Sequence, residues 1–569
     1  MQSSFFGLNV ATQGLFTART SLDIVNHNIS NAETPGYSRQ YGIQSACRPL
    51  PNNGIGMMGT GSEILEVSQY RNRYLDVKFW NSSCHYGEYS VKNTQTSYME
   101  TLLNELKDTG ITKQFADVFN SLQKLSKDPS NFAYRTSFTD MSTSFGKYFN
   151  DVAKQLRSYQ REANFSIKTK IDQINYSANQ LAVLNDQISN LELSGNQAND
   201  LRDKRANIVD ELSKIINVEV EERTDSQGKK TFQVFANGQR LVEGSKVNLL
   251  ETRPRKNLNN PEDENGLFDI YWKNGQIFNM TDSKLEGELK GYIDMRDGNN
   301  GNNFKGKIES LTTDSKTIQV KNPMRTDLPK TGVVEIDGKE YEYTDCVYNG
   351  NSLDPTLTFT LTEDAKVGAQ NISMGDNLMY KGIPYYMEKL NHFVRTIAKE
   401  FNEIHQTGKD KDGNNGVPLF TYKGYTTGDV DYDKMTIDNF QFSPEIKNDV
   451  NKLLTTTDYQ NGQSDNELIL KMLALKHDTD MFDKGEPDNY IQALVGELGI
   501  DKKQAESFER GQMSLNNMIK NQRLSYSGVD LNEETTNIIK YQQAYNMSAK
   551  MISVFDEIYE VTINRLGAS

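Results

Sequence analysis

Apolar residues at both ends of this chain recur at alternating steps of three and four positions. The N-terminal strip consists of Leu8, Ala11, Leu15, Ala18, Leu22, Val25 and Ile29. The C-terminal strip consists of Ile538, Tyr541, Tyr545, Ser548, Ile552, Phe555, Tyr559, Thr562 and Leu566. This heptad spacing places each strip on one face of a helix, as in a coiled coil. Because a short amphipathic helix is marginally stable alone in water, we predict two terminal helices that pair with each other.

The N-terminal strip ends at a turn motif that cannot continue a helix. The motif contains Asn31, Thr34, Pro35, Gly36 and Tyr37. Proline excludes the helical conformation for Thr34 and offers no backbone donor, and Gly36 tolerates a positive φ. We therefore predict a sharp turn directly after the first helix.

Between the two ends, helical patterns alternate with strand patterns. Helical spacing occupies residues 71–107, 111–125, 167–191, 198–216 and 385–404, and two more helical segments precede the C-terminal strip. Alternating and β-branched residues fill residues 218–235 and 308–379, with hairpin signals at Asn237-Gly238 and Asp337-Gly338. The polar run 297–303 predicts a linker between the two β-rich blocks.

These patterns predict an α+β multidomain protein. Its N- and C-terminal helices pair as a coiled coil, a helical bundle forms a rod domain, and β-rich outer domains are inserted in the middle. The predicted boundaries are 1–65 with 526–569 for the terminal domain, 66–217 with 381–525 for the rod domain, 218–297 for the first β-rich domain and 298–380 for the inserted β-rich domain. A chain of 569 residues is long enough for several such domains.

Charge and hydropathy exclude two classes of partner. The formal net charge is −14, and no cluster of Lys and Arg is present to displace counterions from phosphates, so we expect no nucleic acid. No apolar run is long enough for a membrane span, and the first residues lack the pattern of a secretory leader. We therefore expect no membrane insertion and no cleavable signal peptide.

The sequence offers no candidate catalytic, cofactor-binding or metal-binding residue. Its 5 histidines lie outside zinc and catalytic motifs, and its 3 cysteines have no paired spacing. The loop that begins at Asp410 resembles a calcium loop, but Asn415 stands where glycine is needed and Thr421 where a bidentate glutamate should close the shell. We interpret this loop as a polar turn and expect no enzymatic activity.

One family signature surrounds the turn motif. Residues 28–37 read Asn-Ile-Ser-Asn-Ala-Glu-Thr-Pro-Gly-Tyr. This segment resembles the N-terminal signature of the bacterial flagellar rod, hook and hook-associated axial proteins, with Ser30 in place of the usual alanine. The following Ser38-Arg39-Gln40 is more typical of the hook-associated members. Blocks within residues 184–205, 390–408 and 527–545 support the same resemblance, which spans most of the helical chain.

The resemblance implies a structural axial protein at the hook–filament junction, needed for filament assembly and motility. It implies secretion through the flagellar type III export apparatus. The implied partners are the hook protein, hook-associated protein 3, lateral copies of this chain, and a cytoplasmic export chaperone at the C-terminal region. The assembly interface would consist of Leu8, Leu15, Leu22, Val25, Ile29, Ile538, Tyr541, Tyr545, Ile552, Phe555, Tyr559 and Leu566.

Two alternatives stay open at this point. One is a hook or rod axial protein. The other is a secreted enzyme or adhesin on a flagellin-like scaffold, with its site within residues 219–380. A polar cleft whose carboxylates have shifted pKa values would favour the enzyme.

Overall fold

The structure is a computed structural model in which the chain forms two compact units. It describes residues 5–52, 56–103, 110–193, 195–224, 230–255, 258–260, 263–299, 305–311, 316–321, 328, 331–337, 339–349, 356–365, 371–374, 378, 380–458, 464–482 and 485–562. The first unit combines Met1–Gly87, Asp172–Leu250 and Arg510–Ser569. The second combines Glu88–Ile171 and Glu251–Glu509. Three long helices, α2 (Arg73–Leu103), α4 (Phe132–Glu192) and α10 (Pro487–Ser527), contribute to both units.

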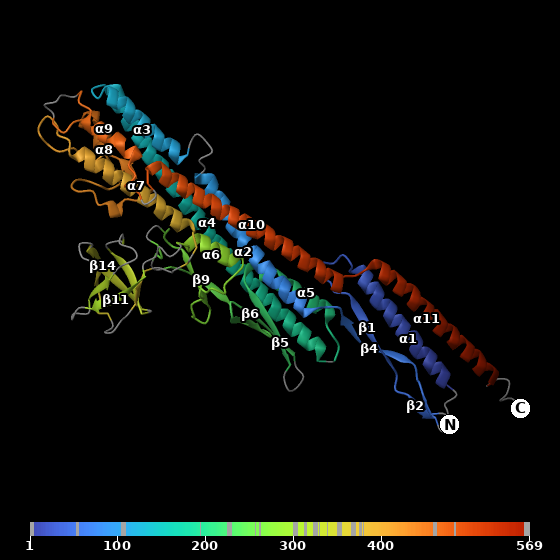
Figure 1. Cartoon of the computed structure of the whole chain (residues 1–569). Helices are drawn as coiled ribbons and strands as arrows, with labels where there is room; N and C mark the ends of the chain where they lie inside the picture. The colour runs from blue at the N-terminus through green and yellow to red at the C-terminus, as the bar shows by residue number, and fades with distance from the viewer. Residues whose placement is uncertain are drawn as a thin grey trace. The chain divides into compact units, whose positions relative to one another are not determined.

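The first unit contains the two ends of the chain (Figure 1). Its further helices are α1 (Phe6–Ser30), α5 (Asn199–Ile215) and α11 (Leu531–Glu560). Its strands are β1 (Gln40–Ala46), β2 (Leu50–Asn52), β3 (Gly56–Met58), β4 (Ser62–Gln69), β5 (Val218–Thr224), β6 (Lys230–Ala236), β7 (Gln239–Glu243) and β8 (Lys246–Val247). β1 pairs with β4 and β2 with β3, both antiparallel, while β5 to β8 form a four-stranded sheet in chain order.

The terminal helices α1 and α11 lie side by side and run antiparallel (Figure 1). At one end of the pair, the rings of Phe5 and Tyr559 lie 5.0 Å apart. A Cβ at Gly7 would overlap the Phe555 ring, and one at Gly14 would lie 3.1 Å from the Ser548 hydroxyl. Glycines one heptad apart therefore let the two backbones approach closely. α11 begins where the Asp530 carboxylate accepts hydrogen bonds from the amides of Asn532 and Glu533.

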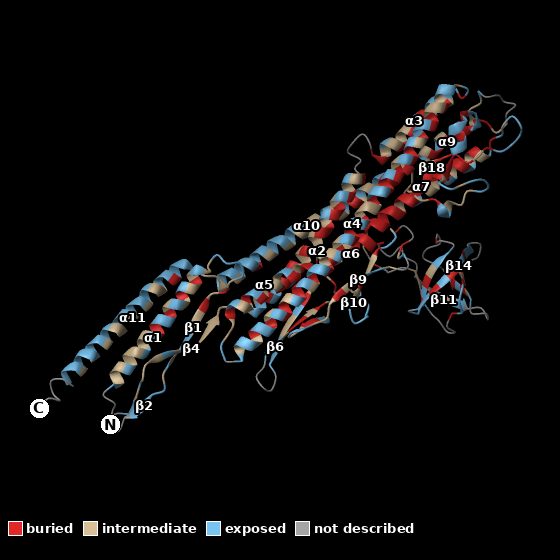
Figure 2. Ribbon diagram, turned by 180° about the vertical axis from the view of Figure 1, so that it is seen from behind, coloured by how far each residue is buried: buried red, intermediate tan, exposed pale blue. Residues whose placement is uncertain are grey.

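The second unit is built on a helical core rich in aromatic side chains. Its helices are α3 (Ile111–Lys127), α6 (Glu288–Asp297), α7 (Ile383–Gln406), α8 (Pro444–Asn448) and α9 (Glu467–Ala474), with short helical turns η1 (Tyr432–Lys434), η2 (Val450–Lys452) and η4 (Leu475–His477). Strand β9 (Leu250–Pro254) pairs with β10 (Phe268–Trp272), and β17 (Phe420–Tyr422) with β18 (Phe440–Phe442). Phe115, Phe145, Phe149, Phe393 and Phe401 are fully buried in this core, as Figure 2 shows for their helices.

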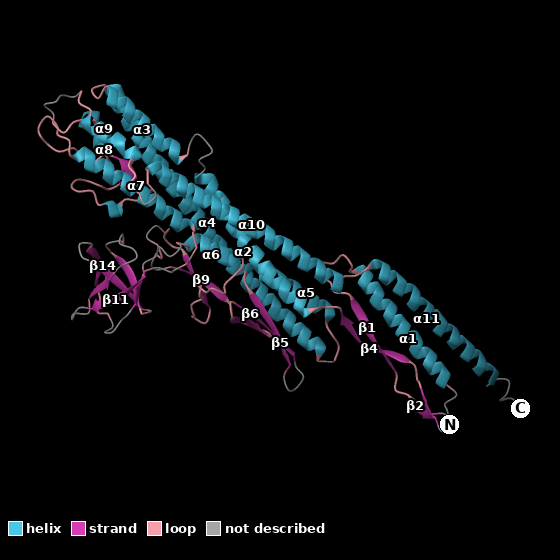
Figure 3. Ribbon diagram, in the orientation of Figure 1, coloured by secondary structure: helices cyan, strands magenta, loops and turns pink. Residues whose placement is uncertain are grey.

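A closed β-barrel is inserted between α6 and α7 (Figure 3). Its strands are β11 (Lys305–Leu311), β12 (Thr317–Lys321), β13 (Gly332–Ile336), β14 (Lys339–Asn349), β15 (Thr356–Leu361) and β16 (Asn371–Ser373). They follow the order β11-β12-β15-β14-β13-β16, and every pairing is antiparallel. The helical and strand patterns thus gave the α+β fold class correctly.

The predicted linker at residues 297–303 is wrong for the part that the structure describes. Asp297 is the last residue of α6, and both Asp297 and Asn299 are buried. The Asp297 carboxylate accepts hydrogen bonds from Arg255 and Arg296, so a polar run that reads as solvated is a packed junction. Residues 300–303 lie outside the described residues, and the predicted domain boundaries stay predictions.

The long central helix and the last helix also differ from their predicted limits. α4 begins at Phe132 and not near residue 167, which gives it 61 residues. α11 ends at Glu560, and Leu566 lies outside the described residues. Over the part of the chain that the structure describes, no helix is apolar enough along 18 residues to cross a membrane.

Candidate assembly interface

The structure brings the predicted interface residues together around the pair of α1 and α11. On α1, Val25 is buried while Leu8, Leu15, Leu22 and Ile29 are half-buried. On α11, the described positions of the predicted strip are all half-buried: Ile538, Tyr541, Tyr545, Ile552, Phe555 and Tyr559. Because these side chains are only half-buried within one chain, part of their apolar surface stays accessible to a further partner. The assembly role of these residues stays a prediction.

A second apolar strip on α11 was missed by the sequence analysis. It consists of Ala544, Met547, Met551, Val554, Ile558 and Val561. All six residues are exposed, and Met547 is 74% exposed. Figure 2 colours much of α11 as exposed. Their steps of three and four repeat the spacing of the first strip, displaced by one position toward the N-terminus. The signal was present in the sequence, and α11 therefore has two adjacent heptad faces, one of which packs on α1.

The turn motif is held by a reciprocal pair of hydrogen bonds around Asn28. Its side-chain amide donates to the carbonyl of Gln40 at 2.9 Å, and its Oδ1 accepts from the amide of Gln40 at 2.9 Å. The Tyr37 hydroxyl also donates to this Oδ1, at 2.8 Å. Burial, followed by the charge of Asp200, raises the pKa of Tyr37, so the phenol stays a donor. The motif thereby fixes the direction in which the chain leaves α1.

Gly36 is the position where the turn tolerates no side chain. Its φ is +75°, and a Cβ there would overlap Oδ1 of Asn207, whose amide donates to the carbonyl of Pro35 at 2.9 Å. We expect Gly36→Ala to lower the free energy of unfolding of the first unit by about 2 kcal/mol, from backbone strain plus overlap. The matched control is Gly238→Ala, whose φ is +71° but whose Cβ meets open space. It should cost about 1 kcal/mol.

Urea unfolding, with hydrogen exchange in α5 and β6 as its readout, measures the free energy of unfolding lost in each glycine variant. Equal losses in the two variants would show that Asn207 yields freely and that the overlap has no energetic weight.

Directly after the turn, two residues tie three helices together. The amide and the hydroxyl of Ser38 donate to the Asp203 carboxylate of α5, each at 2.8 Å. Arg39 donates to Glu534 at 2.5 Å and to Glu533 at 2.8 Å, and its amide donates to the carbonyl of Ser527 at 2.8 Å. Burial raises the pKa of Asp203, although the bonds from Ser38 and the charge of Arg71 oppose it. We call Ser38, Arg39, Asp203, Glu533 and Glu534 the junction cluster.

Further ion pairs, formed by Arg71 and Arg523, adjoin the junction cluster. Arg71 bonds Asp76 at 2.8 Å and Asp203 at 3.2 Å. Arg523 of α10 bonds both Asp76, at 3.0 Å, and Asp210, at 2.8 Å. A hollow of about 480 Å³ lies between these ion pairs and the turn motif. These residues could not be predicted from the sequence, because their partners are far apart in the chain and no local pattern marks them.

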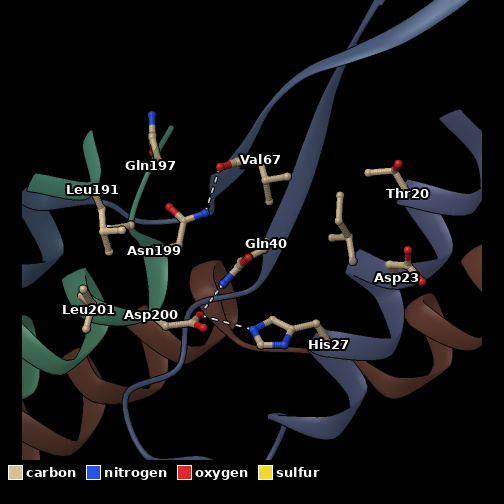
Figure 4. Close-up of a pocket in the computed structure, with 12 residues that line it drawn as sticks. Thr20, Asp23, His27, Gln40, Val67, Leu191, Gln197, Asn199, Asp200 and Leu201 are labelled. Atoms are coloured by element: carbon tan, nitrogen blue, oxygen red, sulfur yellow. Dashed lines mark hydrogen bonds and ion pairs between the residues drawn. The ribbon is translucent and has the colours of Figure 1, made fainter. Parts of the chain in front are cut away.

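A shallower hollow of about 460 Å³ lies where α1 meets α5 (Figure 4). The Asp200 carboxylate accepts from the side-chain amide of Gln40 at 2.7 Å and lies 3.3 Å from Nε2 of His27. Asn199 donates to the carbonyl of Val67 at 2.9 Å. These interactions connect α1, β1 and β4 to α5, so the polar side chains of this hollow hold the fold together.

The enzyme alternative requires a polar cleft, and one lies beside the sheet of β5 to β8. It holds about 780 Å³ between this sheet, α5 and the end of α4. Burial alone would raise the pKa of Glu192 there, but the hydrogen bond and charge of Arg202 outweigh it and hold this pKa below its usual range. Glu192 is thus an ion-pair partner and not a proton donor near neutral pH. Within the described ranges, no three His, Cys, Asp or Glu side chains are grouped as metal ligands.

Comparisons with known proteins point to one group of flagellar proteins. The family model described as "Flagellar hook-associated protein FlgK helical domain" matches residues 96–315, and that described as "Flagellar basal body rod FlgEFG protein C-terminal" matches residues 517–566. The chain is 25% identical over 581 residues to flagellar hook-associated protein 1 of Bacillus subtilis, covering 100% of this chain and 99% of that one.

Relatives from other bacteria give similar values. Identity to flagellar hook-associated protein 1 of Salmonella typhimurium is 24% over 579 residues, and to that of Escherichia coli 24% over 577 residues, each covering 98% of this chain and 99% of the relative. A solved structure, the flagellar hook junction protein FlgK from Burkholderia pseudomallei, has a TM-score of 0.48 at 13% identity, covering 79% of this chain and 100% of that chain.

Proposed function

We propose that this chain, which belongs to the family of flagellar hook-associated protein 1, is a structural axial subunit of the bacterial flagellum at the junction between hook and filament. It acts as a structural protein and not as an enzyme. The match extends over nearly the whole length of both this chain and its relatives, which supports carrying over the role of the whole protein.

The observation that carries the proposal is the second apolar strip of α11. A helix with two adjacent heptad faces suits packing between two neighbouring helices, because each face can insert its side chains between those of a partner. One face packs on α1 of the same chain, and the other is exposed. We infer that the exposed face packs on a helix of a neighbouring copy, so that a ring of copies buries the apolar strip that is exposed in a single chain.

The junction cluster gives the terminal pair a defined attachment to the rest of the first unit. Arg39 fixes the start of α11 and the end of α10 at once, and Ser38 fixes α5. Glu534 is 1% exposed, so separating it from Arg39 would leave a buried charge without its partner. We propose that this cluster sets the direction in which the terminal pair leaves the rest of the unit.

The finer partners follow from the family and belong to this proposal. They are the hook protein, hook-associated protein 3, lateral copies of this chain, and an export chaperone that holds the C-terminal region. We propose export through the flagellar type III apparatus. A hook or rod axial protein is the competing role, and it differs in the stage at which flagellar assembly would stop.

Deletion of the gene separates these roles. We expect a strain without it to make complete hooks, to lack filaments, to release flagellin into the medium and to be non-motile. Electron microscopy of the cell surface and immunoblotting of the medium measure this, and re-expression of the intact gene is the control. A mutant that lacks hooks altogether would indicate a rod or hook protein and would overturn the proposal.

A further inference from the structure

The inserted barrel has a hydrophobic core of its own. The core is formed by Ile318, Val320, Leu328, Val334, Ile336, Tyr341, Tyr343, Cys346, Leu357, Phe359, Leu361, Ala365 and Ile372. Among the described residues, none of these belongs to the aromatic core of the helical part of the second unit. Side chains along β14 and β15 alternate between buried and outward positions, as in a small filled barrel. The barrel therefore buries its apolar residues without the helices.

The chain enters and leaves the barrel at neighbouring points. Asn299 and Lys381 form an antiparallel bridge, and the amide of Gly382 donates to the carbonyl of Gly298 at 2.9 Å. Neither glycine has room for a side chain, since a Cβ on Gly382 would overlap the carbonyl oxygen of Asp294. Ends that lie this close are the geometry of a domain inserted into a host, and a short turn can replace it.

A buried polar cluster holds the entry point from the helical side. Arg296 and Arg255 donate to the Asp297 carboxylate at 2.6 and 3.0 Å. Asn299 donates to Oδ1 of Asn260 at 2.8 Å, and Asn260 bonds the Asp297 carbonyl at 3.4 Å. These groups are nearly inaccessible to solvent, and their partners lie outside the barrel. The stem is thus fixed by the helical host and does not depend on the barrel.

We propose that residues 300–380 contain an accessory module that folds and unfolds independently of the helical host and can be removed without loss of filament assembly. The separate cores and the closed stem carry the first half of this statement. The second half rests on the proposed function, which assigns assembly to the terminal helix pair of the first unit and not to the barrel.

Hydrogen exchange on the full chain tests whether the barrel unfolds independently of the helical host. Phe359 is fully buried in the barrel and Phe393 in the helical core. We expect Phe359→Ala to speed amide exchange in β11 to β16 by about a hundredfold or more, and to leave α6 and α7 unchanged. Phe393→Ala is the matched control and should do the reverse. If Phe359→Ala speeds exchange in α7 to the same extent as in the barrel, the two parts unfold together and the proposal is overturned.

Excision of the barrel tests the second half. Residues 301–379 are replaced by Asn-Gly, which keeps Asn299 and Tyr380 in place. We expect the thermal midpoint of the helical host to move by less than about 3 °C and the variant to restore filaments in the deletion strain as well as the intact chain does. If the intact chain restores filaments but a folded excision variant does not, the module is required for assembly. If the intact chain restores none either, the proposed function fails instead.

Discussion

We expect Met551→Asp to abolish filament formation while leaving the isolated chain folded. Met551 belongs to the exposed strip of α11, is 48% exposed and lies outside the strip that packs on α1, so we expect the α1–α11 pair to persist. In a ring of copies the same position would be buried between helices, where an unpaired carboxylate costs several kcal/mol at every contact. Because this cost recurs in each subunit, we expect assembly to fail completely.

The matched control is Ser553→Asp, two positions along α11, exposed and outside both strips. It adds the same charge to the same helix and should leave motility and filaments intact. Three measurements compare the variants: swimming in soft agar, filaments by electron microscopy, and the thermal midpoint of each purified variant. Filaments from Met551→Asp would contradict the packing proposed for this strip. Charges at Leu15 or Ile552 should also prevent assembly, but at some cost to the α1–α11 pair itself.

We expect the second unit to lose about 3 kcal/mol of stability at His405 as the pH falls from 6.5 to 4. This side chain is completely buried at the end of α7. Its Nδ1 donates to the carbonyl of Val417 at 2.6 Å, and its Nε2 accepts from the amide of Leu454 at 2.9 Å. A proton on Nε2 would face that amide hydrogen. Only the neutral ring satisfies both contacts.

The sign follows from which state binds the proton. Burial lowers the pKa of His405 from 6.5 to about 4 in the folded chain, although the hydrogen bond to Val417 opposes this. Between these values the unfolded chain is protonated and the folded chain is not, so acid favours unfolding. The stabilising effect is fully present above pH 6.5 and is lost as the pH falls toward 4.

Two substitutions isolate this effect. His405→Gln can keep one donor and one acceptor without titrating, so we expect it to reduce the pH dependence of amide exchange in α7 over this range. His477→Gln is the control, because it makes the same substitution at a side chain that is 73% exposed. An unchanged pH dependence in His405→Gln would assign the acid sensitivity to the buried carboxylates instead.

Periodicity made the helices and the fold class predictable, because burial of one face imposes a repeat that a single sequence displays. The same reasoning found Leu15 and Ile552. It stopped at one strip per helix and did not include Met551. The turn motif was also predictable, since Pro35 and Gly36 act through local backbone geometry.

The junction cluster was not predictable in this way. Asp203 meets Ser38 across 165 positions and Glu534 meets Arg39 across 495, so no local pattern links them. The linker predicted from Asp297 onward was wrong for a related reason. A polar run has the same composition whether its side chains are solvated or paired with buried arginines. Tertiary partners decide such positions, and they become visible only when the chain is folded.

The closed barrel has one more consequence if, as proposed, copies of this chain assemble side by side. A sheet with free outer strands presents unpaired amide and carbonyl groups, and adjacent copies held at high local concentration could join through them into aggregates. Here β11 and β16 pair with each other, so the ring of strands has no open end. Under the proposed function, neighbouring barrels can therefore stand next to one another without fusing, and the terminal helices alone determine the order of the assembly.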